Sequence, residues 1–380
     1  GLLNPFLMAA VASRCARLVS HSLQGLTVRC TSSETMPLPE IYFGTMTFGW
    51  SQASSKVDDT VSYEMLKKYV DLGGVQVDTA RIYSAGETEN ILGRILPKSE
   101  FSTKKLVLGT KVHPSQADGL SEKGIRGQLE ASLKAMNVSS VDILYLHQPD
   151  PEHDLRESLQ CAHTLMQEGL VGRYGMSNYS ALEVERCCSL CKDHGWSTPA
   201  VYQGLYNPLN RLVEDELLPV LRKYQVSFVA YNPLAAGLLT GKHAGTDEVL
   251  PGRFKDNPNY LPRFYTQPNF DALAAIRSAC EAAKISMVGA TYSWLLQHSA
   301  LSAEKGDGIL LGASTMSQLE ENLMACQQPM LLPEPVLMAF DAAWPKVLQS
   351  GDVFPYWRSY SKDQPGRESL PPGAAYSAKK

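Results

Sequence analysis

Short β-like runs alternate with amphipathic stretches from Ile41 onward, and this alternation repeats eight times. The chain has no glycine-rich motif after its first expected strand, as a doubly wound nucleotide-binding sheet would have. Eight strand-helix units in one chain predict a (β/α)8 TIM barrel, which is a closed parallel sheet surrounded by helices. The expected strands are residues 41–46, 75–77, 106–111, 141–146, 172–176, 200–203, 227–231 and 308–311.

The segments between these runs support the same architecture. Apolar residues at helical spacing, with Asp and Ser at the N-caps, predict helices that include residues 59–72, 121–136, 155–168 and 213–224. A long connection rich in Pro, Gly and Arg follows the seventh strand over residues 233–268, and we expect it to fold over a ligand. Residues 333–348 should form an extra C-terminal helix, and the barrel domain should cover residues 38–358.

The two ends of the chain differ from this domain in composition. Residues 1–37 contain Arg14, Arg17 and Arg29 but no acidic residue before Glu34, which is typical of a mitochondrial transit peptide. A disordered leader is the alternative, so cytoplasmic and mitochondrial locations both stay open. The tail at residues 359–380 is rich in Pro, Gly, Ser and Lys, a composition that predicts disorder.

Composition limits the class of partner. The net charge is -4 and no long basic run occurs, which argues against a nucleic-acid binder. No apolar stretch reaches the roughly 20 residues of a membrane span, so we expect a soluble protein with a small-molecule partner.

The eight cysteines lack the spacing of a disulfide scaffold. We interpret Cys187, Cys188 and Cys191 as packing residues of a helix, and we predict no metal site.

Four ionisable residues follow the carboxyl ends of predicted strands, which meet on one face of a parallel barrel. They are Asp78, Tyr83, Lys111 and His147. Each residue alone has a structural alternative, such as a capping turn for Asp78 or a hydrogen-bonded core position for His147. Four such residues at matching strand ends favour a catalytic site instead.

These residue types suit carbonyl reduction. A carbonyl that accepts a hydride becomes an alkoxide and needs a proton donor, and Tyr83 could supply the proton. Lys111 would stabilise the phenolate and lower the pKa of Tyr83 from its ordinary value of about 10, and Asp78 would hold the ammonium group in place. His147 would orient or polarise the carbonyl oxygen.

A reductase of this kind also needs a hydride source. Ser177, Asn178 and Gln203 place hydroxyl and amide groups at the same face, where they could bind a carboxamide such as that of nicotinamide. Small residues within 232–242 could let a pyrophosphate approach backbone N–H groups, and residues 312–315 open a helix whose N-terminus suits a phosphate.

The chain closely resembles the aldo-keto reductase superfamily over about residues 41–358. The resemblance rests on Asp78-Thr79-Ala80, Tyr83, Gly109-Thr110-Lys111, Leu146-His147, Gly175-x-Ser177-Asn178, Gln203, Asn232-Pro233-Leu234 and Gly312-x-Ser314. Longer strings, such as residues 201–207 and 232–242, are most similar to the aflatoxin aldehyde reductase subfamily. That likeness implies NADPH-dependent reduction of aldehydes such as succinic semialdehyde and aflatoxin-derived dialdehydes, by subunits that often form homodimers.

The resemblance also implies roles for individual residues. The chain departs from many superfamily members in one respect, because the basic residue that often holds the 2'-phosphate beside Ser314 is absent. Arg253 or Arg263 of the long loop could substitute for it. Arg358 would bind the carboxylate of a substrate, next to Tyr83 and His147. The implied cofactor contacts are Thr45, Met46, Ser177, Asn178, Gln203, Asn232, Leu234, Gly237, Lys242, Arg253, Ser314, Gln318, Glu321 and Asn322.

A second class of function stays open, because similar barrels serve as cofactor-binding β-subunits of potassium channels with little turnover. The sequences Tyr202-Gln203-Gly204 and Asn232-Pro233-Leu234-Ala235 resemble those of the detoxifying reductases more closely than those of the channel subunits. Turnover of an aldehyde would separate the two.

Overall fold

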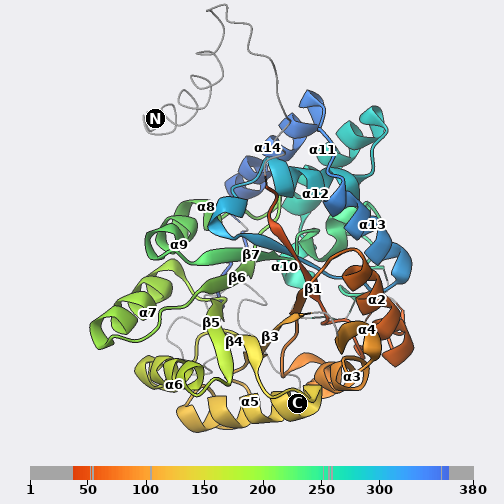
Figure 1. Ribbon diagram of the computed structural model, residues 1–380. Coiled ribbons are helices and arrows are strands. Elements are labelled where there is room, and N and C mark those ends of the chain that lie inside the picture. Colours follow the sequence, from red (N-terminus) through yellow and green to blue (C-terminus); the bar gives the residue numbers. More distant parts are fainter. Residues whose placement is uncertain are drawn as a thin grey trace, which may run out of the picture. The chain divides into compact units, whose positions relative to one another are not determined.

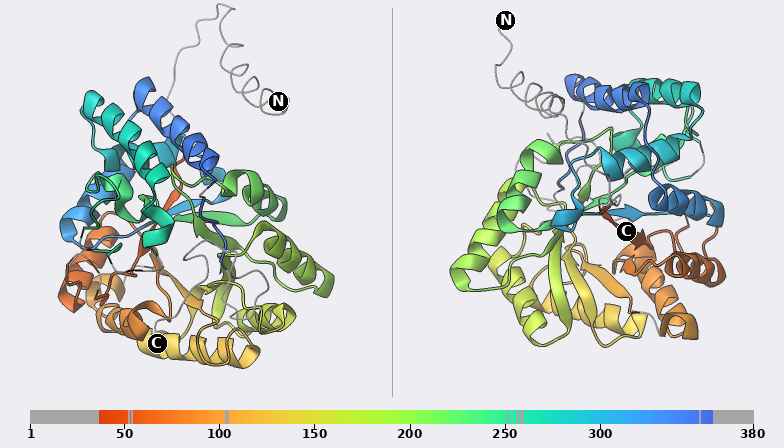
Figure 2. Two further views of the ribbon diagram at one scale, coloured as in Figure 1. Left: turned by 180° about the vertical axis from the view of Figure 1, so that it is seen from behind. Right: turned by 45° about the horizontal axis from the view of Figure 1, so that its top comes forward.

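The computed structural model describes residues 37–51, 53, 55–102, 105–250, 252–255, 257, 260–351 and 353–358. Eight parallel strands form a closed barrel in sequence order, and β8 pairs with β1 to complete it (Figure 1). The helices surround this barrel in both further views (Figure 2). The predicted (β/α)8 barrel is therefore confirmed. The expected leader, apart from Pro37, and the expected tail lie outside the described residues.

The strands are β1 (Glu40–Gly44), β2 (Gln76–Asp78), β3 (Val107–Val112), β4 (Val141–Leu146), β5 (Val171–Ser177), β6 (Val201–Leu205), β7 (Ser227–Tyr231) and β8 (Gly308–Leu311). The helices are α2 (Asp59–Asp71), α3 (Glu87–Ile95), α4 (Ser99–Ser102), α5 (Glu122–Met136), α6 (Leu155–Gln167), α7 (Ala181–His194), α8 (Val213–Glu216), α9 (Leu218–Tyr224), α10 (Leu261–Phe264), α11 (Gln267–Ala283), α12 (Met287–Gln297), α13 (Met316–Gln327) and α14 (Glu334–Gln349). Short 3-10 helices are η1 (Tyr83–Gly86), η2 (Ala235–Thr240) and η3 (Ala303–Lys305).

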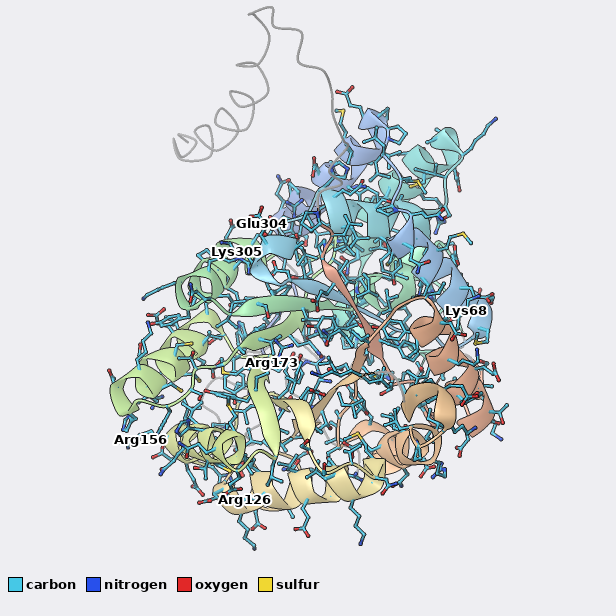
Figure 3. All side chains as sticks on the ribbon, viewed as in Figure 1. Lys68, Arg126, Arg156, Arg173, Glu304 and Lys305 are labelled. Atoms are coloured by element: carbon cyan, nitrogen blue, oxygen red, sulfur yellow. The ribbon has the colours of Figure 1, made fainter. Side chains whose placement is uncertain are left out.

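Local sequence explains where the main helices begin. The side chain of Asp58 accepts the Val61 N–H at the start of α2, and Ser121 accepts the Gly124 N–H at the start of α5. Such caps satisfy backbone donors that the first helical turn leaves free. The outer helical faces carry charged side chains such as Lys68 and Arg126 (Figure 3).

The core has two parts. The larger part lies between the strands and the surrounding helices and contains mostly aliphatic and aromatic side chains. A smaller cluster comprises Tyr42, Ile143, Tyr145, Val201 and Val229, all of them strand residues. The cysteines of α7 are buried, as expected for packing residues. Within the described residues, no helix is long and apolar enough to cross a bilayer, and no cluster of acidic, His and Cys side chains could hold a metal ion.

The structure corrects two expectations about helices. Residues 213–224 form two helices rather than one, because Pro219 at the start of α9 cannot donate the backbone hydrogen bond that would continue α8. The expected loop at residues 233–268 contains η2 and α10, and α11 begins inside it. The further helix α12 was not predicted, since its apolar residues show no polar face.

The C-terminal segment after α14 returns to the barrel. Tyr356 is 1% exposed, and its hydroxyl accepts the Ala181 N–H at 3.0 Å. The Arg358 N–H donates to the Asn178 carbonyl oxygen at 2.8 Å. Because Asn178 directly follows β5, these contacts bring Arg358 to the carboxyl ends of the strands.

Candidate active site

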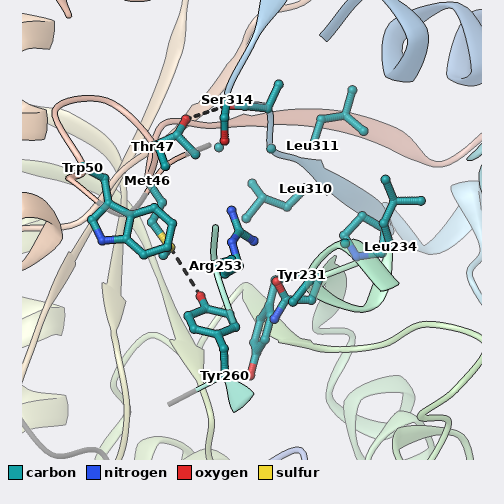
Figure 4. Close-up of a pocket in the computed structure, with 18 of the residues that line it drawn as sticks. Met46, Thr47, Trp50, Tyr231, Leu234, Arg253, Tyr260, Leu310, Leu311 and Ser314 are labelled. Carbon is teal, nitrogen blue, oxygen red and sulfur yellow. Dashed lines mark hydrogen bonds between the residues drawn. The ribbon is translucent and has the colours of Figure 1, made fainter. Parts of the chain in front are cut away.

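A cavity of about 520 Å³ lies at the carboxyl ends of the strands. Met46 and Trp50 line it from the loop after β1, and Arg253 and Tyr260 line it from the segment after β7 (Figure 4). The Tyr260 hydroxyl donates to Met46 Sδ at 3.6 Å. The Arg253 guanidinium carbon is 5.5 Å from the ring centroid of Trp50. The two loops therefore meet beside the cavity.

A buried ion pair forms the base of the site. Asp78 ends β2 and Lys111 lies on β3, and their side chains form a salt bridge while being 2% and 0% exposed. Lys111 Nζ also donates to the Thr79 carbonyl oxygen at 2.7 Å. On β6, Gln203 Nε2 donates to the second Asp78 oxygen at 2.9 Å. Three strands thus hold both charges in fixed positions.

Burial shifts the pKa values of this pair in opposite directions. Removal from water raises the pKa of Asp78, while Lys111 and the amide of Gln203 oppose the shift by stabilising the carboxylate. Burial lowers the pKa of Lys111, and Asp78 and then Glu89 oppose it. The charged form of each residue depends on the other, since either charge alone would be unpaired in the protein interior.

Tyr83 lies above this pair in η1, directly after the β2 loop. Its ring centroid is 5.2 Å from Lys111 Nζ, and it packs edge-on against the His147 ring with centroids 5.9 Å apart. The next residues, Ser84 and Ala85, have left-handed φ values of 49° and 53°. Non-glycine residues adopt this conformation only where surrounding contacts impose it, so the backbone beside Tyr83 is locally strained.

A second buried ion pair supports the η1 turn. Glu89 on α3 is fully buried, forms a salt bridge with Arg81, and accepts the Thr110 hydroxyl at 2.6 Å. A Cβ atom at Gly86 would collide with the guanidinium of Arg81, and Gly86 also has φ 95°. Only glycine therefore lets this arginine lie against the turn.

His147 follows β4 and faces the same part of the cavity. Burial lowers its pKa well below the usual value, and the neighbouring His113, Lys111 and Arg358 lower it further. The imidazole is therefore neutral at neutral pH. Its Nδ1 atom is buried with no hydrogen-bond partner among the described residues. A neutral imidazole here can donate to a carbonyl oxygen without adding a competing charge.

Further polar groups line the cavity beside His147 and near α13. Asn178 Nδ2 donates to the His147 carbonyl oxygen at 2.8 Å and to Ser177 Oγ at 3.0 Å, and its Oδ1 accepts the Tyr231 hydroxyl at 2.8 Å. Near α13, Gln318 accepts the Ser314 N–H at 2.9 Å. The predicted cofactor contacts that line the cavity are Met46, Ser177, Asn178, Gln203, Asn232, Leu234, Gly237, Lys242, Arg253, Ser314, Gln318, Glu321 and Asn322.

Two glycines leave room for a ligand beside the backbone. Gly237 in η2 and Gly312 after β8 both line the cavity, and a Cβ atom at either position would meet no atom within 4 Å. Gly237 also has φ 117°, which side chains rarely adopt. A long polar ligand can therefore approach the main chain at both glycines, as a dinucleotide requires.

The comparison with protein families settles the kinship of this barrel. The model of the aldo/keto reductase family matches residues 40–344. The chain belongs to the aldo/keto reductase family. It is 39% identical to human aldo-keto reductase family 7 member A3, over 78% of this chain and 92% of the relative. It is 39% identical to mouse aflatoxin B1 aldehyde reductase member 2, over 80% and 84%, and 36% identical to the human protein of that name, over 87% and 96%.

In this aldo/keto reductase, two predicted cofactor contacts do not line the cavity. Thr45 is 0% exposed, and its hydroxyl donates to the Asp78 carbonyl oxygen at 2.9 Å, so this side chain supports the end of β2. Arg263 is 3% exposed and stacks on Phe354, with 4.4 Å between guanidinium carbon and ring centroid. Of the two arginines considered for the 2'-phosphate, only Arg253 faces the cavity.

Several lining residues were missed by sequence reasoning. They include Trp50, His113, Gln148, Tyr231 and Tyr260. A signal existed for two of them, because His113 stands two positions after Lys111 and Gln148 directly follows His147. The others come from loops, whose course the sequence pattern does not determine.

Proposed function

We propose that this aldo/keto reductase reduces aldehydes to alcohols with NADPH as the hydride donor and Tyr83 as the general acid. The observation that carries the proposal is the buried Asp78–Lys111 pair beneath the Tyr83 ring, with a neutral His147 facing that ring. NADPH, when bound, supplies the hydride that turns the carbonyl oxygen into an alkoxide.

Each residue of the site has a distinct part in the proton transfer. Tyr83 gives its hydroxyl proton to the developing alkoxide, and the ammonium of Lys111 stabilises the resulting phenolate across the 5.2 Å that separates it from the ring. Asp78, held in turn by Gln203, keeps Lys111 in place. His147 donates a hydrogen bond to the reacting oxygen and so orients the carbonyl carbon.

The lining residues fit a nicotinamide dinucleotide. Ser177, Asn178 and Gln203 lie on the side of the cavity next to the catalytic pair, where their polar groups suit the carboxamide. Gly237 and Gly312 leave space for a pyrophosphate beside the backbone. Arg253 forms no ion pair with any described residue, so its guanidinium is available for the 2'-phosphate that distinguishes NADPH from NADH.

The substrate should be an aldehyde with an anionic group. The mouse and human relatives carry the name aflatoxin B1 aldehyde reductase, which supports an aldehyde as the reacting group. Arg358 lines the cavity close enough to lower the pKa of His147. Its guanidinium can pair with a carboxylate, so succinic semialdehyde is the substrate type we expect.

Steady-state turnover tests the proposal against the alternative of a cofactor-binding subunit with little activity. The purified protein should oxidise NADPH in the presence of succinic semialdehyde or 4-nitrobenzaldehyde, and NADH should support the reaction less well. Tight binding of NADPH without consumption of either aldehyde would contradict the reductase and favour the binding subunit.

A further inference from the structure

Three side chains that line the cavity near Tyr83 each carry a buried polar atom that has no hydrogen-bond partner among the described residues. These atoms are His147 Nδ1, Gln148 Nε2 and Arg358 Nε. Gln148 is only 1% exposed, and burying its amide donor without a hydrogen-bond acceptor lowers the free energy of unfolding. The mechanism above uses His147, and the proposed substrate carboxylate uses Arg358. The amide donor of Gln148 has no partner among the described residues.

The side chain of His113 fixes which end of the Gln148 amide faces the cavity. His113 Nδ1 accepts the Ser115 N–H at 3.0 Å and lies 2.7 Å from Ser115 Oγ. Burial and the nearby Arg358 lower the pKa of His113 to about 3, so the ring is neutral and carries its one proton on Nε2.

The remaining hydrogen bond of His113 is made to Gln148. The Gln148 side chain opposes the fall in the His113 pKa, as an acceptor does when the ring donates to it. Gln148 Nε2 has no partner, so the accepting atom is the amide oxygen. The hydrogen bonds from Ser115 through His113 therefore hold the Gln148 amide oxygen against His113. The NH₂ group of Gln148 is left to face the ligand.

The position of this NH₂ group indicates what it binds. Gln148 follows His147, whose ring packs edge-on against both His113 and Tyr83 with centroids 5.1 Å and 5.9 Å apart. Arg358 is near enough to lower the pKa values of both histidines. A donor amide beside a guanidinium is suited to a carboxylate, which can accept from both groups at once.

We propose that Gln148 is a specificity-determining residue, which donates a hydrogen bond from its amide NH₂ to the substrate carboxylate that pairs with Arg358. The inference rests on the proposed function and deepens it. It assigns the substrate carboxylate two donors from distant parts of the chain. One is fixed by His113, and the other is fixed by the contact of the Arg358 backbone with Asn178.

The test compares substrates that differ only in the carboxylate. Gln148→Met keeps the length of the side chain but removes the donor. Its KM for succinic semialdehyde should rise about 10- to 100-fold, the range expected for losing a hydrogen bond to a charged group, with little change in kcat. Butanal, which has a methyl group in place of the carboxylate, should be reduced as before. Gln160→Met, the same change at an exposed position of α6, is the control.

Two further variants separate a donor role from a packing role. Gln148→Glu keeps the shape but replaces the donor by an acceptor, so it should impair succinic semialdehyde more than Gln148→Met does. His113→Phe keeps a ring but removes the bond that holds the amide oxygen, and a smaller loss in the same direction is expected. Equal losses on butanal and succinic semialdehyde, or no loss on either, would overturn the assignment.

Binding of succinate gives a result that does not depend on turnover. Titration calorimetry of the NADP⁺-loaded protein should show succinate affinity falling about 10- to 100-fold in Gln148→Met and unchanged in Gln160→Met. Unchanged affinity in Gln148→Met would refute the inference even in an active enzyme. Failure of the wild-type protein to reduce either aldehyde, with the succinate difference intact, would contradict the proposed reaction alone.

Discussion

Lys111→Met should both stop turnover and destabilise the fold. Lys111 is 0% exposed, and its ammonium forms a salt bridge with the Asp78 carboxylate and donates a hydrogen bond to the Thr79 carbonyl oxygen. With the ammonium removed, the Gln203 amide is the one remaining hydrogen-bond donor to this carboxylate among the residues that the structure describes. Breaking a buried pair at one partner costs about 3–5 kcal/mol, and we expect a loss of that size in the free energy of unfolding at neutral pH.

The pH dependence of this loss identifies its cause. Burial already raises the pKa of Asp78, and without Lys111 the folded-state pKa rises further above the unfolded value. The folded state then binds the proton more tightly than the unfolded state. The penalty is therefore largest above the folded pKa and shrinks as the pH falls toward about 4, the ordinary pKa of Asp.

Urea denaturation and initial-rate assays measure both effects. The double variant Asp78→Asn, Lys111→Met has no unpaired charge, so it should regain much of the stability while staying inactive. Lys67→Met is a matched control, since Lys67 forms an exposed pair with Asp71 and should change little. Near-native stability together with near-native turnover in Lys111→Met would show that neither the fold nor the reaction needs this ammonium group.

Three further substitutions test single roles. Tyr83→Phe should reduce turnover on the order of 10²-fold or more while NADPH binding, measured by fluorescence titration, stays near wild type; near-native turnover would remove Tyr83 from the mechanism. Arg253→Ala should raise the Kd for NADPH more than that for NADH, because only NADPH carries the 2'-phosphate, and equal losses would place the discrimination elsewhere. Arg358→Ala should raise the KM for succinic semialdehyde about 10- to 150-fold, which corresponds to losing about 1.5–3 kcal/mol of binding free energy. The KM for 4-nitrobenzaldehyde should change little, and equal increases for both substrates would argue against a carboxylate anchor.

The barrel and the base of the site could be predicted because they depend on local patterns. Strand and helix periods repeat along the chain, and a closed parallel sheet brings the ends of β2, β3 and β4 to one face. That rule alone places Asp78, Lys111 and His147 together. Their polar character at the end of apolar runs was the visible signal.

The roles of other residues depend on contacts that sequence patterns do not encode. Gln203 was expected to bind nicotinamide, and its bond to Asp78 joins residues 125 positions apart. Thr45 was predicted to contact the cofactor and Arg263 was an alternative to Arg253, but the Thr45 hydroxyl bonds to the end of β2 and the Arg263 guanidinium stacks on Phe354. Only the folded loop geometry distinguishes a side chain that faces the cavity from one that supports its wall.

Transfer of deuterium from labelled cofactor shows whether a hydride reaches the aldehyde carbon at this site. NADPH carrying deuterium at both positions of nicotinamide C4 is incubated with the protein and succinic semialdehyde, and the product is examined by mass spectrometry. We expect a hydroxy acid with one deuterium on the former aldehyde carbon, and Tyr83→Phe should form it at a greatly reduced rate. An unlabelled alcohol, or no alcohol while labelled NADPH stays bound, would contradict hydride transfer at this site.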